Sequence, residues 1–184
     1  IENTFNTPIS MLNAAGTGTI TVNGNFSHAG TSAFRLCSST AVTTTTLNIK
    51  GDMTLSGTSS FDFNVQNSSS TTNTLNLGGD LSVASTALLT NTNTSKLGVF
   101  NFNGTGDGST AALTQTVDIA GSNASRNKQI TFATKSGSYV QIANRNFELG
   151  TSSTLTVESG SVFDCGYNGT DGWALLPVSV GTST

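Results

Sequence analysis

The segment Thr19-Ile-Thr-Val-Asn-Gly-Asn-Phe26 decides the fold, because it recurs along the same chain. Two copies are Thr46-Leu-Asn-Ile-Lys-Gly-Asp-Met53 and Thr74-Leu-Asn-Leu-Gly-Gly-Asp-Leu81, and a shorter copy is Val99-Phe-Asn-Phe-Asn-Gly104. Apolar and polar residues alternate up to the Gly, as they do in a strand with one buried face. The glycines recur every 25 to 28 residues. Self-similarity at such a period indicates a repeat protein.

Each repeat holds two more short alternating segments after its Gly. The first starts at Phe26, Met53 and Leu81, and the second contains Phe34, Phe61 and Leu89. Three short strands joined by tight turns predict one coil of a parallel β-helix. Stacked coils pair every strand with the coils on either side, which buries apolar faces that a single coil leaves open. We therefore expect Ile20, Leu47 and Leu75 to form one inward column, with Val22, Ile49 and Leu77 in the next.

The predicted fold class is all-β, a right-handed parallel β-helix with three short strands per coil and roughly five to six coils. One domain spans residues 1–184, with the coils at 17–166. Residues 1–16 are expected to be an N-terminal cap or lead-in and residues 167–184 a C-terminal cap or linker, because both break the repeat and a solenoid needs covered ends. Residues 104–129 are expected to loop around one strand, Val117-Asp-Ile119, and Phe147-Glu-Leu149 to form another strand.

A glycine closes the first strand of each repeat and is followed by an Asn or Asp in the first three. Glycine adopts positive φ without steric cost, and Asn or Asp tolerates the same bend. These positions are therefore predicted to be structural corners, at Gly24, Gly51, Gly79 and Gly104.

The composition favours an extracellular protein. The chain has 32 Thr, 25 Ser and 20 Gly, and only 9% of its residues are charged, against about a quarter in an ordinary soluble domain. The seven basic residues form no patch, which argues against nucleic acid as a partner. No apolar stretch is long enough to span a membrane. We expect a secreted or cell-surface location and no cofactor.

The repeats resemble those of large surface proteins of Bacteroidota. The resemblance rests on Leu47-Asn-Ile-Lys-Gly-Asp-Met-Thr-Leu55, Phe100-Asn-Phe-Asn-Gly-Thr105 and Leu155-Thr-Val-Glu-Ser-Gly-Ser-Val-Phe163, and it covers about residues 17–166. It implies a right-handed β-helix, export to the surface, commonly by type IX secretion, and an adhesive or scaffold role. The C-terminal sorting domain usual in that group is not visible in this sequence.

The function predicted first is a structural or adhesive surface module without catalytic activity. Its partners would be neighbouring domains, surface glycans or other copies of the chain. A self-assembling filament is an alternative, because apolar groups at 9–15 and 173–180 lie outside the repeat and would act either as caps or as end-to-end contacts.

Two further alternatives depend on side chains that recur on outward faces. Asp52 and Asp80 share a column, and paired carboxylates can divide acid and base roles in a carbohydrate-active β-helix, although turn formation explains them more simply. An ice-binding solenoid would use regular Thr pairs. The residues concerned are Thr19, Thr46 and Thr74, with the adjoining column Thr21, Asn48 and Asn76.

The remaining candidates predict no catalytic or metal site. His28, the only histidine, occupies the place of Leu55 in the next coil and is expected to mark a wetter terminal coil. Arg35 and Asp62 are expected to form an ion pair between coils. Cys37 and Cys165 should be too many coils apart for a disulfide. The Gly-rich segments 103–108 and 168–172 hold few carboxylates and fit neither the EF-hand nor the nonapeptide calcium pattern, so they indicate a calcium site only weakly.

Overall fold

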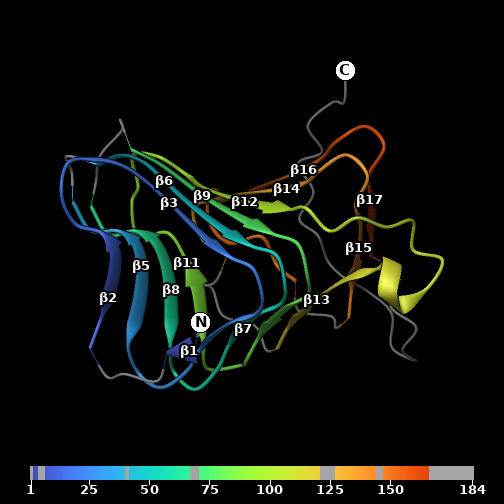
Figure 1. Ribbon diagram of the computed structural model, residues 1–184, viewed down its shortest axis with the longest axis horizontal. Helices are drawn as coiled ribbons and strands as arrows, with labels where there is room; N and C mark the ends of the chain where they lie inside the picture. The colour runs from blue at the N-terminus through green and yellow to red at the C-terminus, as the bar shows by residue number, and fades with distance from the viewer. Residues whose placement is uncertain are drawn as a thin grey trace.

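Three parallel sheets enclose a single core in the computed structural model (Figure 1), which describes residues 2–3, 7–39, 42–66, 71–120, 127–143 and 147–165. Sheet A contains β1 (Glu2–Asn3), β4 (Phe26–His28), β7 (Met53–Leu55), β10 (Leu81–Val83), β13 (Gln115–Ile119), β15 (Tyr139–Ile142) and β17 (Val162–Asp164). Sheet B contains β2 (Ile9–Leu12), β5 (Ala33–Cys37), β8 (Ser60–Asn64) and β11 (Leu88–Thr90). Sheet C contains β3 (Gly16–Val22), β6 (Val42–Ile49), β9 (Thr72–Leu77), β12 (Gly98–Phe102), β14 (Ile130–Thr134) and β16 (Thr154–Val157).

Up to β12 the chain visits the three sheets in turn and advances by one strand at each return, and the whole makes a β-solenoid of about five turns. After β12 the described residues alternate between sheets C and A, because sheet B has no strand beyond β11, so the expected three strands per coil hold only for the earlier coils. All strand pairs that join consecutive coils are parallel, as in β4 with β7 and β6 with β9. Figure 1 shows the progression as a colour gradient, with the blue coils at one end of the stack and the orange coils at the other. The all-β parallel solenoid predicted from the repeat is therefore confirmed.

The predicted inward columns form in the expected register. Ile20 pairs with Leu47, which pairs with Leu75, and both leucines are fully buried. Ile20 differs, because its side chain is 38% exposed. The reason is its place on β3, the edge strand of sheet C, which has a neighbouring strand on one side only among the described residues. The expectation that all three residues are buried alike was wrong for Ile20.

Aromatic side chains fill the core from coil to coil. Phe34 stacks on Phe61 with ring centroids 5.6 Å apart, and Phe100 lies 5.5 Å from Phe132. Eight phenylalanines are buried, and a ninth, Phe163, is half-buried against them. Burying each large apolar side chain stabilises the fold by about 1.5–3 kcal/mol, so these columns account for the cohesion of the stack.

Two expected segments can be followed in the structure. Residues Ile9–Leu12, part of the expected cap or lead-in, form β2, which pairs with β5 and adds a first strand to sheet B. Phe147-Glu-Leu149 is not a strand, although Phe147 is buried between Phe132 and Phe163. Phe147 is thus positioned by packing against the two neighbouring rings, although its backbone forms no strand pairing. The predicted C-terminal cap, 167–184, lies outside the described residues.

Between β12 and β14 the repeat is interrupted, as expected. The predicted strand is present as β13, and the loop before it contains a short 3-10 helix, η1 (Ala111–Leu113). This loop covers a corner of the solenoid and shapes the candidate site. In the described part of the chain, no helix has the length and hydropathy needed to cross a membrane.

Candidate functional site

A ladder of Asn and Asp side chains runs along the corner between sheets C and A. Asn25 Oδ1 accepts a hydrogen bond of 2.9 Å from the backbone N–H of Asp52, and Asp52 Oδ1 accepts one of 3.0 Å from the N–H of Asp80. Asp80 Oδ1 in turn accepts a hydrogen bond of 2.7 Å from the N–H of Thr116. Each side chain therefore satisfies a main-chain donor of the next coil, at a place where the chain leaves one sheet for another.

The ladder gives Asp52 and Asp80 a role in the corner itself. Asn25 makes the same bond without a charge, so the bond requires an acceptor oxygen and not a carboxylate. Among the described residues, the second oxygen of each carboxylate has no hydrogen-bond partner. These two oxygens are available to a ligand.

Close packing requires glycine at Gly51, Gly79 and Gly104, and the positive φ proposed for the corner glycines was wrong. None of Gly24, Gly51, Gly79 and Gly104 has positive φ. A Cβ added to Gly79 would lie 2.5 Å from the carbonyl carbon of Gly51, whereas one added to Gly24 would meet nothing within 4 Å. The difference arises because Gly24 belongs to an earlier coil and its open side faces away from the stack.

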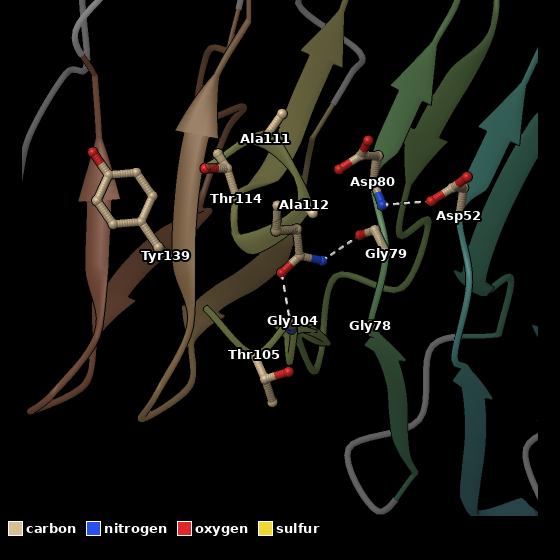
Figure 2. A pocket seen from close by; sticks show the side chains of 11 residues that line it. Asp52, Gly78, Gly79, Asp80, Gly104, Thr105, Ala111, Ala112, Thr114 and Tyr139 are labelled. Carbon is tan, nitrogen blue, oxygen red and sulfur yellow. Dashed lines mark hydrogen bonds between the residues drawn. The ribbon is translucent and has the colours of Figure 1, made fainter. Parts of the chain in front are cut away.

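A pocket of ≈ 320 Å³ lies over this corner (Figure 2). Asp52 and Asp80 form one side, Tyr139 the opposite side, and Thr105 and Thr114 lie between them. The floor is glycine backbone, from Gly78, Gly79 and Gly104. The pocket is thus a shallow polar basin built from four successive coils, which brings together residues from 52 to 139.

Gln115 fixes the loop that forms the pocket wall, and the sequence did not single it out. Its Oε1 accepts a 3.0 Å hydrogen bond from the N–H of Gly104, and its Nε2 donates to the carbonyl oxygens of Leu77 and Gly79. The side chain is only 4% exposed. Gln115 takes an inward position in a strand whose other inward residues, Val117 and Ile119, are apolar, and this was the available signal, but the interrupted repeat hid the register of the strand.

Tyr139 is held in place from two directions. Its hydroxyl donates a 2.8 Å hydrogen bond to Asp164 Oδ2, and this bond raises the pKa of the phenol above its usual value. A Cβ on Gly108, which has φ +74°, would lie 2.5 Å from Tyr139 Cε2, so the loop backbone packs directly against the ring. The ring is therefore a fixed wall of the pocket.

A second cavity of ≈ 410 Å³ adjoins the first and shares Gly78 and Thr105 with it. It is lined by Asn48, Asn76 and Lys50 on sheet C and the turn that follows. A second ladder of hydrogen bonds orders these amides. Asn76 Nδ2 donates a hydrogen bond of 2.8 Å to Asn48 Oδ1, and Asn101 Nδ2 donates one of 2.7 Å to Asn76 Oδ1. The two cavities, termed here the corner groove, follow the chain around the corner from sheet C to sheet A.

The outward face of sheet C carries more threonines than the repeat alone indicated. Thr19, Thr46 and Thr74 stack in register, as predicted. The register of β3, β6, β9, β12, β14 and β16 places fifteen residues in three columns: Thr17, Thr44 and Thr72; Thr19, Thr46, Thr74, Val99, Thr131 and Thr154; and Thr21, Asn48, Asn76, Asn101, Ala133 and Thr156. Ten of these are Thr, and none is charged or aromatic.

His28 does not mark a wet coil, and that expectation was wrong. The imidazole is fully buried, because β1 adds to β4 and extends sheet A past it. Its Nε2 lies 3.0 Å from the carbonyl oxygen of Ser32 and its ring packs against Phe34. Nδ1 has no hydrogen-bond partner among the described residues. His28 is a core residue with one unsatisfied nitrogen.

Arg35 and Asp62 occupy paired positions in β5 and β8 but form no ion pair, contrary to expectation. Asp62 is 5% exposed and accepts hydrogen bonds from the N–H of Asn64 and from the N–H and hydroxyl of Thr92. These nearer donors satisfy the carboxylate. Within the described ranges the one ion pair joins Lys135 to Glu158.

The cysteines and the acidic residues provide no further site. Cys37 and Cys165 are both free thiols, as predicted, and burial raises the pKa of each. No group of three or more His, Cys, Asp or Glu able to hold a metal ion occurs in the part of the chain that the structure describes. The chain matches no family model, and neither a curated protein nor a solved structure shows significant similarity to it.

Proposed function

We propose that this chain is a structural and adhesive module of a secreted or cell-surface protein, acting as a stalk, scaffold or adhesin repeat without catalytic turnover. The observation that carries the proposal is the Asn25–Asp52–Asp80 ladder. Carboxylates that sit in an apparent catalytic column are bonded to the backbone of successive coils, so their first role is to hold the stack.

The low charge of the chain supports the same proposal. A chain with 9% charged residues and a Thr-rich sheet face interacts weakly with salts and with nucleic acid. Parallel coils that share one continuous core resist bending, since sheets A and C join neighbouring coils along the stack and sheet B adds a third ladder in the earlier coils. Rigidity and a neutral polar surface suit a spacer that projects from a cell.

Antibody labelling of the source cells tests the location. Antibodies raised against the purified chain should label intact cells as strongly as permeabilised cells. Labelling that appears only after permeabilisation would contradict a surface module, because the chain would then be intracellular.

A second candidate function is ice binding, favoured by the three outward columns of sheet C. Strands about 4.8 Å apart present threonine methyl and hydroxyl groups at regular intervals, and the Asn48–Asn76–Asn101 ladder fixes the third column. Thermal hysteresis measured on the purified chain tests it. Activity that Thr46→Tyr abolishes and Ser82→Tyr, on sheet A, leaves intact would support ice binding, and the absence of hysteresis would exclude it.

A further inference from the structure

We propose that the corner groove binds an uncharged oligosaccharide. The inference rests on the proposed adhesive function and deepens it by naming the class of ligand and the surface that holds it. The groove combines carboxylates, hydroxyls, amides and one aromatic ring above a floor of backbone. The polar groups can form hydrogen bonds with sugar hydroxyls, and the aromatic ring can pack against the C–H face of a sugar ring.

The size of the groove fits such a ligand. Pockets that bind small molecules have volumes of roughly 300–1,000 Å³, and the two cavities measure ≈ 320 and ≈ 410 Å³. Because they share Gly78 and Thr105, a linear ligand can lie in both. The groove turns around a corner of the solenoid, so it suits a chain of several linked rings better than one compact ring.

The floor allows close approach of the ligand to the main chain. Side chains are excluded there, since a Cβ on Gly78 would lie 2.8 Å from the carbonyl oxygen of Lys50 and one on Gly104 would lie 2.8 Å from Gln115 Oε1. The groove is therefore kept open by the packing of the coils beneath it. Its shape is fixed before any ligand arrives, which lowers the entropic cost of binding.

The polar groups in the groove are largely acceptors for hydroxyl donors. Asp52 and Asp80 each retain one carboxylate oxygen that no described residue uses. Hydrogen bonds from sugar hydroxyls to these oxygens are charge-assisted and about twice as strong as neutral ones. At the other end, Asn48 and Asn76 are held by their ladder and present ordered amides.

Tyr139 supplies the apolar component. Sugar rings have one face lined by C–H groups, which packs against an aromatic ring. The Tyr139 ring is fixed by its bond to Asp164 and by the loop backbone at Gly108. It stands across the pocket from Asp52 and Asp80, two or more strands away (Figure 2), so one ring of an oligosaccharide can rest on Tyr139 while the next ring of the same ligand offers its hydroxyls to the carboxylates.

Charge selects neutral sugars over the other ligands. Asp52 and Asp80 outnumber Lys50, the basic residue in the groove lining, so the groove carries a net negative charge that disfavours uronic acids and sulfated sugars. A calcium ion takes six to eight oxygen ligands, and the described residues hold no group of three metal-binding side chains. An uncharged donor of several hydroxyls fits the groove best.

Calorimetric titration of the full chain with neutral hexasaccharides tests this inference. The probes are the β-1,4-linked hexamers of glucose, xylose and mannose, and the control probe is the α-1,4-linked hexamer of galacturonic acid. We expect one neutral hexamer to bind and the acidic hexamer to bind at least tenfold more weakly. Tyr139→Ala and the double variant Asp52→Asn/Asp80→Asn should each weaken binding about tenfold, the effect of one lost charge-assisted bond or one ring contact.

The double variant keeps the fold intact, because Asn25 shows that an amide oxygen can make the same corner bond. Asp118→Asn is the matched control, since it removes a carboxylate from sheet A outside the groove and should leave binding unchanged. Absence of binding to all three neutral hexamers at millimolar concentration would overturn the inference, as would binding that none of the groove variants weakens. Either result leaves the proposed surface role standing, because that role is tested by location and by turnover.

Discussion

Asp52 Oδ1 accepts a 3.0 Å hydrogen bond from the main-chain N–H of Asp80, 28 residues further along and one coil up the stack. The same bond is made by Asn25 to the N–H of Asp52. A side-chain oxygen at this position therefore joins each coil to the next. The charge of the carboxylate is not needed for that bond.

Replacing Asp52 separates the bond from the charge. Asp52→Asn should leave the free energy of unfolding unchanged within about 0.5 kcal/mol, whereas Asp52→Ala should lower it by about 1 kcal/mol, the net value of one hydrogen bond. Urea denaturation of both variants checks the prediction. Equal losses in the two variants would mean that the charge stabilises the corner and the hydrogen bond does not.

The corner glycines give a paired test of close packing. Gly79→Ala should lower the free energy of unfolding by about 1–3 kcal/mol, the usual cost of forcing an atom into a packed site, because the new Cβ meets the backbone of Gly51. Gly24→Ala is the control, since its Cβ meets nothing within 4 Å. If both substitutions destabilise the protein equally, the packing account of the corner fails.

The repeat predicted the core of the fold because period-two alternation follows directly from the geometry of a strand. The columns through Leu47 and Leu75, and the free state of the two cysteines, came from register alone. The burial of His28 could not be predicted from the register. The residue is covered by β1, and the first residues of the chain do not match the repeat. Gln115 was missed because its three hydrogen-bond partners lie in other coils or across a loop, and such contacts leave no local pattern.

His28 is predicted to reduce stability relative to an apolar residue in the same column. His28→Leu places the side chain found at Leu55 in the next coil against the same core. The substitution removes a buried nitrogen that has no partner among the described residues, whose desolvation costs about 1–3 kcal/mol, although it also removes the bond to Ser32. The melting temperature should stay level or rise. A clear fall would show that the Ser32 bond outweighs the unsatisfied nitrogen.

The Lys135–Glu158 ion pair makes stability depend on pH. The hydrogen bond from Lys135 lowers the pKa of Glu158 below its usual value. A lowered carboxyl pKa stabilises the fold at pH values above the unfolded pKa, about 4.3 for Glu, and this contribution is lost as the pH falls through the folded pKa. The wild-type protein should therefore melt higher than Glu158→Gln at pH 7, and the two should converge at low pH.

Salt provides the control for this ion pair. Both side chains are partly exposed, so the difference at pH 7 should shrink in concentrated salt, which screens surface charges. A difference in melting temperature that is the same at pH 7 and at low pH would contradict an electrostatic origin.

The absence of turnover is the central claim, and a reducing-end assay tests it most directly. The full chain is incubated with neutral and acidic polysaccharides, including pectin and alginate, and newly formed reducing ends are measured over time. The account predicts no increase above a heat-denatured control with any substrate, for the wild-type chain and for Asp52→Asn alike. Steady release of reducing ends by the wild-type chain, abolished by Asp52→Asn while the melting temperature is unchanged, would contradict it and make the Asp52–Asp80 column a catalytic site.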